Sequence, residues 1–147
     1  MCAHDRLCRT LGGKVGKAET GWDIEVRKVE IMESSEWKFN EEMGEIPSSL
    51  SIIECHHDEV WEIPFGAQVM GFSDQTAVEI LAIGGHMLGI QGHPLHSKDI
   101  LCNLVDRLLN NDTIQVNVFL ILLSASTYRL QFHYLSFFFF FFLPCNW

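Results

Sequence analysis

Residues 89–94, with the sequence GIQGHP, constrain the fold more than any other stretch because they set a histidine between a strand and a helix. The apolar run over residues 87–90 is typical of a short buried strand that ends in a glycine turn. Pro94 then fixes the direction of the chain, and a serine caps a predicted amphipathic helix over residues 97–110. His93 is therefore predicted at the carboxyl end of a strand, where open α/β sheets bind their ligands. A structural role in the turn is the alternative.

The other predicted elements are one helix and four strands, all before residue 87. A helix is predicted over residues 1–11, where a pair of glycines ends it, and residues 33–49 are predicted to form a polar surface loop. Alternating or continuous apolar runs predict the strands, which cover residues 22–32, 50–53, 67–72 and 77–83.

Two further stretches make this pattern more specific. Residues 8–16 read CRTLGGKVG, and residues 54–61 read ECHHDEVW. In this order and at this separation, they resemble the second half of a class I glutamine amidotransferase domain. The resemblance is narrowed to the plant γ-glutamyl peptidase branch by GWDI at 21–24, SIIECH at 51–56, DEVWEIP at 58–64 and LGIQGHP at 88–94. It extends from about residue 7 to residue 112.

The resemblance implies a fold and a division of the chain. The expected fold is α/β, a class I glutamine amidotransferase-like domain of the flavodoxin-like or Rossmann-like three-layer type, with its N-terminal half missing. Residues 1–112 are expected to form this partial domain, and residues 113–147 a hydrophobic tail outside the family. The missing half would supply central strands of the sheet and one backbone donor of an oxyanion hole.

The resemblance also implies a reaction, the hydrolysis of γ-glutamyl bonds in glutathione or its conjugates. In the family a cysteine thiolate attacks the carbonyl carbon, a histidine moves the proton, and an acidic residue orients the histidine. His93 matches the general base, but Met1 stands at the nucleophile position and Leu95 at the acid position. Neither side chain can act, so the chain is expected to be an inactive relative. The alternative is a non-catalytic fragment or binding remnant.

Three positions of the resemblance concern the substrate. His56 and Asp58 match the segment whose backbone helps to hold the α-amino and carboxylate groups of the γ-glutamyl substrate. An ungapped alignment of the first residues places His4 on the histidine and Asp5 on the glutamine of the family's elbow motif. Asp5 is therefore the third expected substrate-binding residue.

Other residues could replace the lost catalytic groups. Cys2 is adjacent to the nucleophile position and could use its own terminal amine as a base, but no elbow strand would direct it. Cys55 and Cys102 lie in apolar settings and are expected to be inert core thiols. His96 or Asp99 could orient His93, although Asp99 is better explained as an acidic residue in the first turn of a helix.

No metal site and no other cofactor is expected. The potential zinc ligands are Cys55, His56 and His57 in one stretch and His93 and His96 in another. Adjacent residues on a strand point to opposite faces, so the first three cannot easily converge on one ion.

Composition limits the partners and the location. The formal net charge is −9 and all 19 acidic residues precede Thr113, which argues against nucleic acid as a partner. Five cysteines without paired spacing, and no secretory signal peptide, predict a reducing compartment, the cytosol. The expected partner is a small γ-glutamyl molecule if the chain is active, and the oligomeric state stays open.

Residues 113–147 differ sharply in composition from the rest. Between Thr113 and Leu143 only Arg129 is charged, and six consecutive phenylalanines precede Leu143. The charge-free stretch 113–128 is shorter than the roughly 20 residues that a membrane-spanning helix needs, so membrane association is not expected. The favoured interpretation is a segment never selected as protein, and the alternative is a membrane-associated tail. Either way, such an exposed apolar run promotes aggregation.

Overall fold

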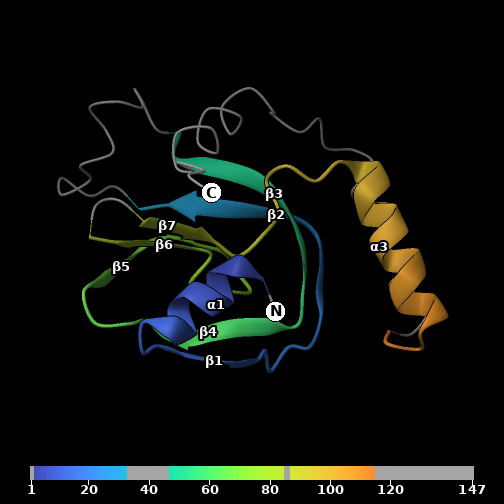
Figure 1. Cartoon of the computed structure of the whole chain (residues 1–147). Helices are drawn as coiled ribbons and strands as arrows, with labels where there is room; N and C mark the ends of the chain where they lie inside the picture. The colour runs from blue at the N-terminus through green and yellow to red at the C-terminus, as the bar shows by residue number, and fades with distance from the viewer. Residues whose placement is uncertain (1, 33–46, 85–86, 115–147) are drawn as a thin grey trace, which may run out of the picture.

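The computed structural model of the protein describes residues 2–32, 47–84 and 87–114 (Figure 1). Five strands form one curled sheet in the order β3–β2–β5–β6–β7, and each neighbouring pair is antiparallel. The bounds of these strands are Asp23–Ile31 for β2, Ser49–His56 for β3, Ala67–Phe72 for β5, Ile80–Ile83 for β6 and Met87–Ile90 for β7.

A short helix and a two-stranded ribbon pack against this sheet. Strands β1 (Lys14–Lys17) and β4 (Asp58–Glu62) pair with each other, and helix α1 (Ala3–Thr10) lies between that ribbon and β7 (Figure 1). The apolar side of α1 is held by a buried cluster that joins the helix, the ribbon and β6, namely Cys8, Val60, Val78 and Leu81. Burial of such side chains is the main source of stability in a domain of this size.

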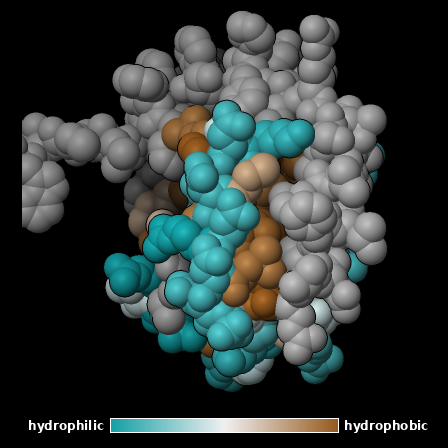
Figure 2. Space-filling view, turned by 90° about the vertical axis from the view of Figure 1, so that its right-hand side faces the viewer, coloured by the Kyte–Doolittle hydropathy of each residue, from teal (hydrophilic) through white to brown (hydrophobic). Residues whose placement is uncertain are grey.

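Helix α3 (Lys98–Asn110) begins at Ser97, whose hydroxyl accepts a hydrogen bond of 3.4 Å from the backbone N–H of Ile100. Its buried residues Leu101 and Val105 are one helical turn apart, so they share a face, which packs on Ile24 and Ile53. Figure 2 shows the outward face of this helix as a hydrophilic band with a hydrophobic strip beside it. The helix is therefore attached to the β2–β3 pair by apolar contacts.

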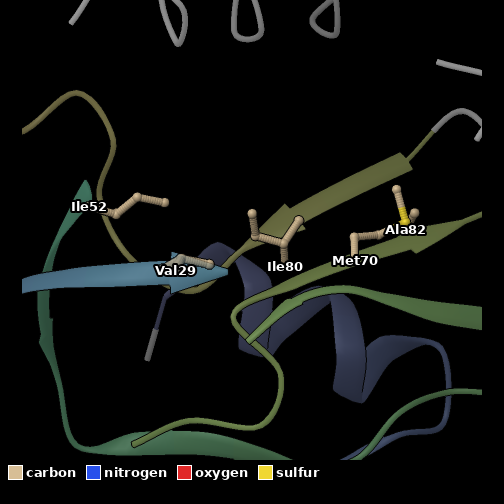
Figure 3. Packing of buried hydrophobic residues seen from close by; sticks show 5 residues of the cluster. All are labelled: Val29, Ile52, Met70, Ile80 and Ala82. Atoms are coloured by element: carbon tan, nitrogen blue, oxygen red, sulfur yellow. The ribbon is translucent and has the colours of Figure 1, made fainter. Parts of the chain in front are cut away.

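The sheet has its own core on its other face. Figure 3 shows five side chains from four strands that pack together there, namely Val29, Ile52, Met70, Ile80 and Ala82. Ile52 belongs to this cluster, whereas its neighbour Ile53 faces α3, because successive side chains on a strand alternate between faces. Strand β3 is thus buried on both faces.

The sheet consists of two parts joined by a narrow seam. Strands β2 and β3 pair over eight positions, from Asp23–His56 to Glu30–Ser49. Strands β2 and β5 pair at only two positions, Glu30–Phe72 and Ile31–Gly71. A hydrogen bond of 2.9 Å from the backbone N–H of Met32 to the carbonyl of Met70 extends this seam.

The predicted helices and strands agree with the structure in type, and two corrections concern their extent. The strands at 67–72 and 87–90 and the helix at 97–110 are confirmed. The predicted strand at 50–53 is too short, since β3 continues to His56, and the predicted strand at 77–83 begins three residues too early, since β6 starts at Ile80. Strands β1 and β4 were not predicted, because their residues are mostly charged and pair across the ribbon, as Lys14 does with Glu62.

Several predictions fall on residues outside the described ranges. They concern Met1, the loop at 33–46 and residues 115–147, so the proposed division of the chain at residue 113 stays a prediction. Among the residues that the structure does describe, no helix is long and apolar enough to cross a membrane.

Candidate active site

The candidate base lies in the turn that follows β7, here called the His93 turn (residues 91–96). Two backbone hydrogen bonds fix its course. The N–H of Gln91 donates to the carbonyl of Glu79 at 2.7 Å, and the N–H of His93 donates to the carbonyl of Ile53 at 2.8 Å. Because Ile53 belongs to β3, the second bond holds the end of β7 against the opposite edge of the curled sheet.

The imidazole of His93 is half-buried and stacks on that of His96, with ring centroids 4.1 Å apart and an interplanar angle of 21°. Burial lowers the pKa of His93 below its ordinary value, and the charges of His96 and His56 lower it further. His93 is therefore a neutral imidazole at neutral pH, which is the form that a general base needs.

Among the groups that the structure describes, no acidic side chain raises the pKa of His93 against this shift. Leu95 is 52% exposed and offers no carboxylate, in agreement with the sequence. Asp99 lies in the first turn of α3, as predicted from its position. His96 contacts His93 by its ring face, so in this arrangement it stacks on the base and does not orient it by a hydrogen bond.

The structure brings two of the expected substrate-binding residues to the same place. Nδ1 of His56 lies 3.0 Å from the carbonyl oxygen of Asp58, and the side-chain amide of Gln91 donates to the same oxygen at 3.1 Å. The corner between β3 and β4 is thereby tied to the His93 turn. The ring of His57 instead stacks on that of Trp22, with ring centroids 5.3 Å apart.

Asp5 is engaged at the start of α1. It is fully buried, and its Oδ2 accepts hydrogen bonds from the backbone N–H of Cys2 at 3.1 Å and from the Cys2 thiol at 3.2 Å. His4, also buried, packs against Gly89 of β7, where a Cβ would approach the His4 ring to 2.9 Å. In this arrangement the Asp5 carboxylate caps a helix, and its role toward a substrate stays a prediction.

The described cysteines show no sign of activation. Burial raises the pKa of the Cys2 thiol to about 12, and the Asp5 carboxylate adds to this effect. Burial also raises the pKa of Cys8 and of Cys55, which packs on the side of β3 that faces α3. Cysteine proteases and transferases need a lowered pKa, so none of these three thiols resembles a prepared nucleophile.

We expect Cys2 to resist alkylation. A rise of the thiol pKa from 9.0 to about 12 lowers the thiolate fraction at pH 8 roughly 1000-fold, and only the thiolate reacts. Iodoacetamide labelling of the folded chain, followed by peptide mass spectrometry, measures this rate, with half-buried Cys102 as the internal comparison. In guanidinium chloride both should react at the same rate. Labelling of folded Cys2 at the rate of a free thiol would contradict the raised pKa of its thiol.

Two buried acidic residues near this corner were missed by sequence reasoning. Glu54 and Glu79 are 0% and 1% exposed, and both carboxyl groups have raised pKa values because of burial. For Glu79, the charge of Glu54 adds to the effect and the pKa reaches about 8. Burial lowers the pKa of His56, but the neighbouring Glu54 carboxylate outweighs this and raises it overall. The available signal was a charged residue inside an apolar run, SIIEC in one case and VEIL in the other.

Comparison with known proteins identifies similar sequences. No protein-family model matches the chain. It is 42% identical over 107 residues to gamma-glutamyl peptidase 5 of Arabidopsis thaliana, and 43% identical over 109 residues to gamma-glutamyl peptidase 3 of the same plant. Each match covers 73% of this chain but only 43% of the relative. The chain thus spans less than half the length of these two γ-glutamyl peptidases.

Solved structures agree on the fold. A glutamine amidotransferase from Thermotoga maritima superposes with a TM-score of 0.61 at 20% identity, over 83% of this chain and 50% of that one. A glutamine amidotransferase from Methylobacillus flagellatus gives a TM-score of 0.57 at 18% identity, over 75% and 41%. The described domain therefore has the class I glutamine amidotransferase fold, as the sequence predicted.

Proposed function

We propose a function on one premise: this chain belongs to the class I glutamine amidotransferase-like family, in its γ-glutamyl peptidase branch. The chain carries the base-bearing part of a cysteine-dependent γ-glutamyl hydrolase site. Its substrate class is the γ-glutamyl amide, with glutathione or its conjugates as the expected molecules and the cytosol as the expected location. The observation that supports this most is the place of His93 in the turn after β7, where Gln91 of the same turn is hydrogen-bonded to the carbonyl of Asp58.

The proposed chemistry assigns a role to each part of the corner. His93 would take the proton of an attacking thiol and return it to the leaving amine. The backbone around His56 and Asp58 would hold the α-amino and carboxylate groups of the γ-glutamyl substrate. That backbone is well fixed, because the carbonyl of Asp58 already faces Nδ1 of His56 and accepts from Gln91.

We also propose that this chain does not complete the hydrolysis of a γ-glutamyl amide. The side chain of Met1 has no ionisable group that could act as a nucleophile, and Leu95 cannot hold the second ring nitrogen of His93. Cys2, the nearest thiol to the nucleophile position, has a pKa of about 12. A site with a base but no nucleophile gives no covalent intermediate.

The unmodified chain should therefore release no glutamate from glutathione above the background rate. His93→Ala should leave that background unchanged, because a base without a nucleophile contributes nothing. The measurement is an enzyme-coupled glutamate assay on the folded chain, with an intact γ-glutamyl peptidase as positive control. Release that disappears in Cys2→Ala would overturn this proposal and make Cys2 the nucleophile.

A binding role is the second candidate, and the fixed corner at Asp58 favours it. Two donors hold that carbonyl without any help from the catalytic positions. A γ-glutamyl ligand would then shift the imidazole proton signals of His56 and His93 in an NMR titration with S-methylglutathione. If both signals stay constant up to millimolar ligand, the corner does not bind this class of molecule.

A further inference from the structure

Three side chains with metal-binding atoms meet behind the His93 turn, and they form what is called here the Glu54–His56–Glu79 cluster. Their exposed fractions are 0%, 8% and 1%. One ligand atom from each lies within 4.8 Å of the others, and Nε2 of His56 is 3.3 Å from Oε2 of Glu54. Glu54 and His56 are two residues apart on β3 and so share a face, while Glu79 comes from the segment before β6.

The backbone holds all three residues in place. Glu54 and His56 belong to the β2–β3 ladder, where they pair with Glu25 and Asp23. The N–H of Glu79 donates to the carbonyl of Gly71 at 2.9 Å, and its own carbonyl accepts from Gln91. Two members of the cluster are thus held by β3, and Glu79 is held by backbone hydrogen bonds to Gly71 of β5 and to Gln91.

The carboxylates of this cluster are buried without hydrogen bonds of good geometry. By hydrogen-bond geometry, none of the described residues partners an oxygen of Glu54 or Glu79 or Nε2 of His56, although the Ser73 side chain acts on Glu79 and lowers its pKa against the effect of burial. Arg27, whose charge acts on Glu54, is already paired with Asp23 at 2.7 Å and with Asp74 at 2.9 Å. Two buried carboxyl groups this close cannot both stay ionised alone, so the cluster holds either protons or a cation.

The tautomer of His56 indicates where that charge belongs. Its Nδ1 lies 3.0 Å from the carbonyl oxygen of Asp58, and because a carbonyl only accepts, Nδ1 must carry the hydrogen. In a neutral ring, the lone pair of Nε2 then faces the Glu54 carboxylate at 3.3 Å. A divalent cation between these atoms gives two carboxylates and a neutral imidazole no net charge. Without a cation, a proton on Nε2 and a second proton on Glu79, whose pKa is raised to about 8, give the same neutrality, so the geometry of the three ligand atoms carries the argument for an ion.

We propose that Glu54, His56 and Glu79 bind a divalent cation of the zinc class. An imidazole and two carboxylates are ligands that Zn²⁺ accepts, and the donation from the other ring nitrogen to a carbonyl is the usual support of a metal-binding histidine. Ligand atoms about 2.0–2.1 Å from a tetrahedral zinc ion lie roughly 3.3 Å apart, which matches the His56–Glu54 distance. This site differs from the cysteine and histidine set considered from the sequence, and of that set it uses only His56.

The role of the ion would be structural. The Glu54 carboxylate lies directly against the backbone of Gly92, where any Cβ would overlap it. Gly92 immediately precedes His93, so an ion bound to Glu54 would fix the backbone position from which the His93 side chain extends.

The test is zinc binding by the full untagged chain after removal of metal with a chelator. Competition with a chromophoric chelator should show one tight equivalent of Zn²⁺ per folded monomer. Glu79→Gln and His56→Gln should each weaken it at least about 100-fold, since even loss of an outer-shell partner costs 10–100-fold. Glu79→Gln keeps the size of the side chain and removes an unpaired charge, so that variant should fold, as circular dichroism would verify.

Two matched controls separate this site from others. Cys2→Ser changes the other group of close ligand atoms, Cys2, His4 and Asp5, and His96→Asn removes a neighbouring imidazole. Both variants should keep the full affinity for Zn²⁺. The proposal is wrong if the folded chain binds no stoichiometric Zn²⁺, in which case the two carboxyl groups share a proton. It is equally wrong if tight binding survives Glu79→Gln or is lost in Cys2→Ser.

Discussion

Hydrolysis of glutathione is expected to return only when two changes are combined in one chain. The first change is a fusion of the upstream part of an Arabidopsis γ-glutamyl peptidase to the N-terminus of this chain. The elbow cysteine then takes the place of Met1, as in Met1→Cys. The second is Leu95→Glu. Such catalytic groups act as a unit, and loss of the nucleophile alone costs about a millionfold in turnover. An imidazole without its orienting acid loses about 10⁴-fold, as measured in a serine protease triad.

Five proteins are compared in the glutamate assay. The unmodified chain and Leu95→Glu alone should be inactive, and the fusion alone should be roughly 10⁴-fold slower than the fusion with Leu95→Glu. His93→Ala should abolish the activity of the combined protein. If the fusion alone is as fast as the combined protein, another residue orients His93, and Asp99 in the first turn of α3 becomes the one to test.

The second large effect concerns Gly92→Ala. The new Cβ would overlap the carboxylate of Glu54, which would have to shift within the interior because this side chain is fully buried. Forcing extra atoms into a packed interior typically costs about 1–3 kcal/mol, and we expect the upper end here. Thermal unfolding should then begin roughly 10 °C or more below that of the unmodified chain.

A double variant distinguishes this overlap from a general effect on the turn. Glu54→Ala removes the carboxylate, so Gly92→Ala should cost much less free energy of unfolding in that background. The coupling energy from this cycle should be at least about 1 kcal/mol, as for residues in direct contact. An equal cost in both backgrounds would show that Gly92 is needed for the backbone of the turn and not for the space beside Glu54.

Sequence reasoning succeeded where local pattern alone determines the structure. The apolar run 87–90, the turn at Gly92 and the serine cap at Ser97 all depend on neighbouring residues, and the structure confirms each of them. The ribbon of β1 and β4 was missed because its stability comes from pairing between residues more than forty positions apart, as in Lys14–Glu62. The hydrophobic pattern of one segment carries no information about such a partner.

The residues of the candidate site also fall into those that the sequence indicated and those that it did not. His93 was found because its turn has a local signature, and His56 and Asp58 because of the family resemblance. Glu54 and Glu79 were missed because their meaning depends on burial and on each other across twenty-five residues. An isolated acidic residue in a strand is usually solvated on one face, and only the fold shows that these two face inward.

The backbone hydrogen bond from His93 to Ile53 has a mechanical consequence for the whole sheet. It joins the turn that follows β7, the last strand in the sheet order, to β3, the first. The five strands and this turn therefore form a closed ring in the order β3, β2, β5, β6, β7. The ring has two narrow joints, the two-residue seam between β2 and β5 and the closure at the candidate base, which rests on this single hydrogen bond. The position of His93 therefore depends on the ring staying closed.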